Sequence, residues 1–150
     1  MHRTITDAVP GEPIDEIRVL WRLRSVTHDI ALLREEAGAA KERRSDPIWL
    51  RGVSYAFVTA VGSCADVAQH LCAVEQWGPP ADDGAAFELL GVRGVLPEPV
   101  ATAMGGAAQL RDDLVRQQVD VDHALLDRLL DTHPVESCVA AVAEFVEQRY

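Results

Sequence analysis

The residue types best suited to chemistry gather in one segment, Arg111 to Asp122, which reads RDDLVRQQVDVD. Arg111 and Arg116 place two permanent positive charges five positions apart, and Asp112 lies between them. Guanidinium groups bind phosphate and counter negative charge that develops on it, but arginine stays protonated and carries no acceptor. The segment therefore offers cations for a phosphate and no group for proton transfer. A solvated surface, with Asp112 and Arg116 as an ion pair four residues apart on one helix face, is the alternative.

The same segment resembles the signature of the HepT-like branch of the HEPN superfamily, R-N-x-L-V-H-x-Y-x-x-V-D. Five positions match in register: Arg111, Leu114, Val115, Val121 and Asp122. Three positions depart from it, because Asp112 stands for Asn, Arg116 for the catalytic His, and Gln118 for Tyr.

The resemblance extends over roughly residues 14 to 149. Residues 87–97, FELLGVRGVLP, resemble the family's approach to the signature helix, F-x-x-L-x-x-x-G-V-L-P/S. Residues 66–70, DVAQH, are similar to a D-I-A-N-H stretch of the second long helix, and Pro79-Pro80 falls at a proline-containing connection. The resemblance implies a helical bundle that forms a homodimer.

Family members with an intact signature are metal-independent ribonucleases without a cofactor, in which two subunits build one site. Histidine transfers the proton and arginine stabilises the phosphorane, so Arg116 in place of His removes the acid–base group. We therefore expect a toxin–antitoxin type protein whose ribonuclease site is degenerate and which binds RNA or a partner. Two alternatives remain: an active endoribonuclease that uses Arg111 and Arg116, and a helical interaction module with no RNA role.

The resemblance also implies a protein partner. In the family, a nucleotidyltransferase antitoxin of the MntA type transfers AMP to the tyrosine at the position of Gln118. Glutamine has no hydroxyl to accept that group, so this chain is not expected to be silenced there.

Other polar residues are weaker candidates. Asp66 and His70 are four residues apart, a spacing at which the carboxylate could orient the imidazole or both could bind one metal ion. Two metal ligands without a third make a weak metal site, so a polar contact inside the bundle is favoured and no metal is expected. His123 follows Asp122, the expected cap of a short helix, and is predicted to be a surface residue of its first turn rather than a replacement base.

Composition narrows the classes of function. The chain has 150 residues, enough for one domain with a real core, and a net charge of −10, which argues against non-specific binding of nucleic acid. Three cysteines, an odd number, indicate a reducing compartment, and Cys64 is expected in the core. Without a signal peptide or a run of about 18 apolar residues, we predict a cytoplasmic protein with no membrane contact.

Hydrophobic periodicity predicts an all-α, up-and-down bundle of about five to six helices. Residues 1–12 are expected to form a flexible arm, and residues 13–150 the HepT-like domain. A first helix is predicted from Pro13, and Gly38 together with the stretch 41–45 is expected to end it. A second is predicted from Asp46, which can cap it, with Pro47 in its first turn, to Gly78. Further helices are predicted over 82–90, from Pro97 through the signature, over 122–130 and over 134–150. The second has the clearest apolar seam, formed by residues at steps of three and four: Leu50, Val53, Phe57, Ala60, Cys64, Val67, Leu71 and Val74. Gly105-Gly106 is expected to permit a close approach between helices.

Overall fold

The computed structural model describes residues 13–117 and 119–150, and every regular element in this part of the chain is an α-helix. The helices are α1 (Glu16–Ala37), α2 (Lys41–Arg44), α3 (Pro47–Val74), α4 (Asp83–Val92), α5 (Glu98–Val115), α6 (His123–Leu130) and α7 (His133–Arg149). The arm expected over residues 1–12 and the candidate Gln118 lie outside the described residues.

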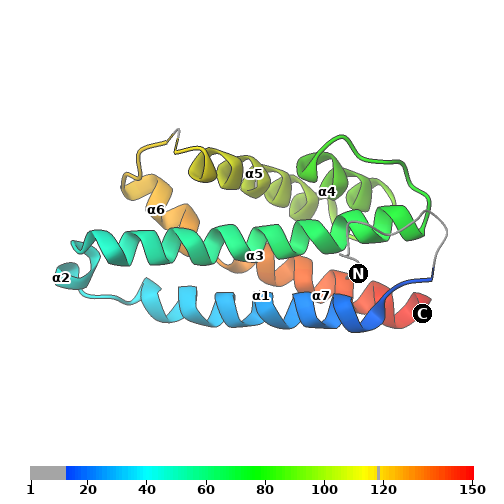
Figure 1. Ribbon diagram of the computed structural model, residues 1–150, viewed down its shortest axis with the longest axis horizontal. Helices are drawn as coiled ribbons and strands as arrows, with labels where there is room; N and C mark the ends of the chain where they lie inside the picture. Colours follow the sequence, from blue (N-terminus) through cyan, green and yellow to red (C-terminus); the bar gives the residue numbers. More distant parts are fainter. Residues whose placement is uncertain (1–12, 118) are drawn as a thin grey trace, which may run out of the picture.

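The four longest helices form an up-and-down bundle (Figure 1). α1, α3, α5 and α7 run in alternating directions, α4 packs against α5 and α3, and α6 lies at the end of the bundle where α5 finishes. The predicted all-α bundle is confirmed. The one-turn helix α2 was not predicted, because Lys41–Arg44 was expected only to end the preceding helix.

The central helix is α3, which packs against each of the other six helices. Asp46 caps it by accepting a hydrogen bond from the Ile48 amide at 2.9 Å, and Pro47 occupies its first turn, as the sequence predicts. The predicted seam is buried along most of its length: Val53, Phe57, Ala60, Cys64, Val67 and Leu71. These side chains are covered by other helices of the same chain, because α3 is surrounded on several sides.

The same burial corrects one expectation from the sequence. By length and composition, α3 could cross a membrane, whereas no segment long and apolar enough to do so was predicted from the sequence. Most of its apolar window, 67%, is buried inside the bundle, as in the core helix of a globular protein. A helix in contact with six others must be apolar around most of its circumference.

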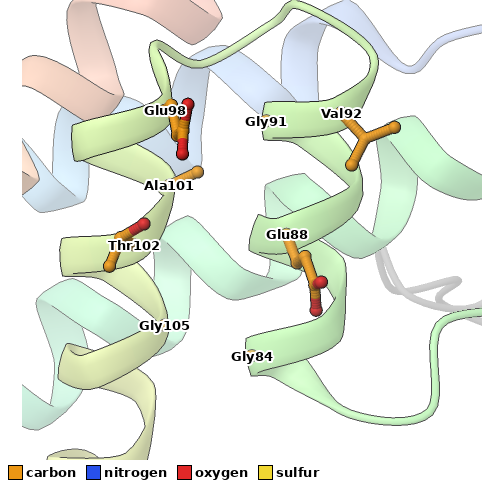
Figure 2. A pocket seen from close by; sticks show the side chains of 8 residues that line it. All are labelled: Gly84, Glu88, Gly91, Val92, Glu98, Ala101, Thr102 and Gly105. Carbon is orange, nitrogen blue, oxygen red and sulfur yellow. The ribbon is translucent and has the colours of Figure 1, made fainter.

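The closest helix contacts do not occur at Gly105-Gly106, so that expectation is wrong. A Cβ atom added at Gly105 would meet nothing within 4 Å. A Cβ at Gly91 would come within 2.7 Å of the Ala101 Cβ, where α4 meets α5. Figure 2 shows the Ala101 side chain pointing from α5 toward α4. Gly62 of α3 is the second close contact, because a Cβ there would lie 3.0 Å from Arg111 Nε.

Candidate anion-binding site

Arg111 lies on α5 and reaches across to the middle of α3. Its Nε donates a hydrogen bond to the Val58 carbonyl oxygen at 3.1 Å, between residues 53 positions apart. The guanidinium group lies over Gly62, and 30% of the side chain remains exposed. The arginine is therefore held at one end while part of it still reaches solvent.

One carboxylate of α3, that of Asp66, interacts electrostatically with this guanidinium. Asp66 lies one turn of α3 beyond Gly62 and forms an ion pair with Arg22 of α1, with Nη2 and Oδ2 3.4 Å apart. Partial burial raises the pKa of the Asp66 carboxyl above its ordinary value, Arg22 opposes this, Asp83 adds to it, and Arg111 opposes it. Two arginines from different helices thus act on one carboxylate. Arg22 could not be recognised as a site residue from the sequence, because nothing in its local sequence separates it from the other basic residues of α1.

Arg116 is the C-cap residue of α5 and is exposed. No ion pair within 4 Å joins it to Asp112 in the described chain, so the pair considered as the alternative to a phosphate site is not present. The Asp112 carboxylate lies instead 4.0 Å from Arg111 Nη1. Positions five residues apart on an α-helix differ by about 140° around the axis. The two arginines of one chain therefore leave α5 in different directions, and the structure shows no contact between them.

The helix cap predicted at Asp122 is confirmed. Its carboxylate accepts a hydrogen bond from the Leu125 amide at 2.9 Å, and His123 is an exposed residue in the first turn of α6, also as predicted. Both residues line a surface cavity of about 580 Å³, whose wall includes Lys41 and Arg44. This cavity is formed by residues of α2, α3 and α6 and the segments beside them, and does not include Arg111.

The predicted polar contact of His70 is also confirmed. The imidazole is 2% exposed, and its Nε2 accepts a hydrogen bond from the Asp15 amide at 3.1 Å, next to the start of α1. His70 thus joins two helices below the surface, while Asp66 on the same helix binds Arg22. Over residues 13–117 and 119–150, no three His, Cys, Asp or Glu side chains converge as a metal-binding group.

All three cysteines are free and buried. Burial raises the pKa of Cys72 to about 11. Contact with Cys138, together with burial, raises the pKa of Cys64 well above its ordinary value. A nucleophilic cysteine needs a lowered pKa, so thiolate chemistry is disfavoured at these two positions.

A second cavity, of about 560 Å³, lies between α4 and α5 (Figure 2). This cavity was not expected from the sequence. Glu88 and Glu98 stand on its walls, the rest of the lining is glycine, alanine, Val92 and Thr102, and no basic side chain belongs to it. Carboxylates repel phosphate, so this cavity does not suit the ligand that Arg111 would bind.

The chain is similar to known proteins in both sequence and fold. A family model described as HepT-like, ribonuclease HepT-like, matches residues 23–147. The search of curated proteins finds no match. The solved structure of a tri-AMPylated Shewanella oneidensis HEPN toxin in complex with MNT antitoxin is 15% identical, with a TM-score of 0.79, over 87% of this chain and 99% of that one.

Two further solved structures are similar. A toxin–antitoxin structure with AMP-PNP is 16% identical, with a TM-score of 0.76, over 84% of this chain and 97% of that one. YutE from Bacillus subtilis, a cytosolic protein of unknown function, is also 16% identical with a TM-score of 0.76, over 90% of this chain and 92% of that one. At such identities, the likeness establishes a shared fold.

Proposed function

Because the chain belongs to the HepT-like ribonuclease family, we propose that it is a toxin–antitoxin type subunit whose ribonuclease site has lost proton transfer and still binds RNA. The position of Arg111 carries the proposal. Its guanidinium is anchored to α3 through Nε, and it remains partly exposed where the family signature places the phosphate-binding arginine. Arg116, at the position of the catalytic histidine, retains charge without acid–base chemistry.

The proposal predicts RNA binding without efficient cleavage. Native protein should bind a labelled RNA hairpin at low salt, and Arg111→Ala should weaken binding by about ten- to hundredfold, since a charge-assisted contact to phosphate contributes about 1.5–3 kcal/mol. Fluorescence anisotropy measures the binding, and gel analysis of the same RNA with EDTA measures cleavage. Arg51→Ala, an exposed arginine on another part of α3, is the control.

Each alternative function has its own signature in this experiment. Native protein that cleaves RNA in EDTA, with cleavage lost in Arg111→Ala, would identify an active metal-independent nuclease. If native protein neither binds nor cleaves RNA, the helical interaction module is the function that remains. Its partner would then be a protein, such as a nucleotidyltransferase antitoxin.

The proposed homodimer rests on two observations. The apolar seam of α3 is satisfied within one chain, but α1 exposes Ile17, Leu20 and Trp21 at steps of three and four, each more than 60% exposed. Contiguous exposed apolar side chains mark an interaction surface more reliably than isolated ones. The different directions of Arg111 and Arg116 on α5 also suit a site that two subunits build together.

We expect native mass spectrometry of the purified protein to give twice 16.4 kDa, the mass of a dimer. A monomer at micromolar concentration would contradict the two-subunit site.

Co-expression with a family nucleotidyltransferase should leave the mass of the chain unchanged, without an added AMP, because Gln118 has no hydroxyl. An AMP adduct on Gln118 would contradict this chemistry. Three free cysteines support a cytoplasmic location for this assembly.

A further inference from the structure

We propose that Gly62 is a positioning residue for Arg111, because its missing side chain lets the guanidinium group lie against α3 and so fixes where a phosphate can bind. The identity of the ligand rests on the proposed function, whereas the position of Arg111 rests on its contacts with α3. A Cβ at residue 62 would lie 3.0 Å from Arg111 Nε, 3.2 Å from Nη2 and 3.4 Å from Cζ. These similar distances show that the guanidinium lies across the glycine rather than touching it with one end.

The hydrogen bond beside Gly62 determines which nitrogens face a ligand. Arg111 Nε donates to the Val58 carbonyl oxygen, one turn before Gly62 on the same helix. Arginine has five N–H donors, and Nε carries one of them. The donors on Nη1 and Nη2 are then those that a phosphate would meet, with the Asp112 carboxylate 4.0 Å from Nη1.

The surroundings favour one position for this group. Asp66, one turn after Gly62, acts on Arg111 electrostatically and is held by Arg22 at 3.4 Å. Val58, Gly62 and Asp66 thus form a line along α3 that offers a carbonyl acceptor, a bare backbone and a carboxylate. A methyl group at residue 62 would move the guanidinium by a few tenths of an ångström away from the Val58 carbonyl oxygen. The same shift would change its approach to the Asp66 carboxylate.

Glycine inside a helix lowers the stability of that helix relative to alanine, so Gly62 has an energetic cost unless the space it leaves is used. Gly52 lies on the same helix, and a Cβ there would meet nothing within 4 Å. Gly52→Ala is therefore a matched control, with the same chemical change in the same helix and no contact with Arg111.

The first test measures the position of Arg111 without any ligand. In the NMR spectrum of full-length protein, Gly62→Ala should move the Arg111 Nε–H signal and speed its exchange with solvent, since the bond to Val58 weakens. Gly52→Ala should leave both unchanged. An unchanged Arg111 signal in Gly62→Ala would overturn the inference, whatever the RNA result.

The second test measures binding of the labelled RNA hairpin. Gly62→Ala should weaken binding about three- to tenfold, because displaced contacts lose strength steeply with distance. In an Arg111→Ala background, the same substitution should have no further effect. An equal loss in both backgrounds would show a general structural role and would overturn the inference. Absence of binding by native protein would refute the proposed function and leave the NMR result to decide the positioning.

Folding of the variants gives a third reading. If Gly62→Ala does not fold but Gly62→Ala/Arg111→Ala does, the clash with Arg111 is the cause, which supports the inference. If the double variant also fails to fold, the space at Gly62 serves another neighbour and the inference is wrong.

Discussion

Replacing Arg116 with histidine is expected to create metal-independent cleavage of a structured RNA, or to raise it by about 10²–10⁴-fold. Histidine titrates near pH 6.5 and can pass a proton at neutral pH, whereas arginine cannot. Arg116 is an exposed C-cap residue without an ion-pair partner within 4 Å in the described chain, so the change should leave the fold intact. Arg111 would then stabilise the phosphate while the new imidazole moves the proton.

The measurement is the rate of RNA hairpin cleavage with EDTA present. Arg116→Ala is the control, because it removes the charge without adding a base and should remain inactive. Adding Arg111→Ala to Arg116→His should abolish the gain. Since Asp112 places a carboxylate 4.0 Å from Arg111 and Gln118 departs from the signature, a variant that also carries Asp112→Asn and Gln118→Tyr should be at least as active.

One result would contradict this explanation of the site. If the triple variant is folded and dimeric but still inert, the site has diverged beyond these three residues. The chain would then act by binding alone.

Phe87→Ala is expected to lower the free energy of unfolding by about 3–5 kcal/mol, the usual cost of truncating a buried phenylalanine. Phe87 is 0% exposed and lies on α4, which packs against both α5 and α3. Loss of the ring leaves a cavity among three helices, two of which carry Arg111 and Gly62. RNA binding by the folded fraction should therefore weaken as well.

Urea unfolding followed by circular dichroism measures the change. Val92→Ala, on the same helix but 75% exposed, is the control and should change stability by less than about 0.5 kcal/mol. A loss below about 1 kcal/mol for Phe87→Ala would mean that α4 contributes little to the core.

The sequence by itself determined the helices and several of their ends. The seam of α3 repeats at steps of three and four because those residues share one face, and that spacing is local information. Asp46 and Asp122 could be predicted as caps because a cap is satisfied by amides two or three residues away. The resemblance around Arg111 likewise lies in one continuous segment.

The tertiary structure alone decided which residues surround Arg111. Its anchor, Val58, is 53 positions away, and Gly62 and Asp66 lie on the same helix as Val58. Asp66 in turn pairs with Arg22 of α1. His70 similarly meets Asp15 from 55 positions away. Periodicity shows which face of a helix is buried, but not which turn of one helix lies opposite which turn of another. That register depends on how all the side chains between the helices fill space together, which is why Gly105-Gly106 was the wrong close contact and Gly62 was not foreseen.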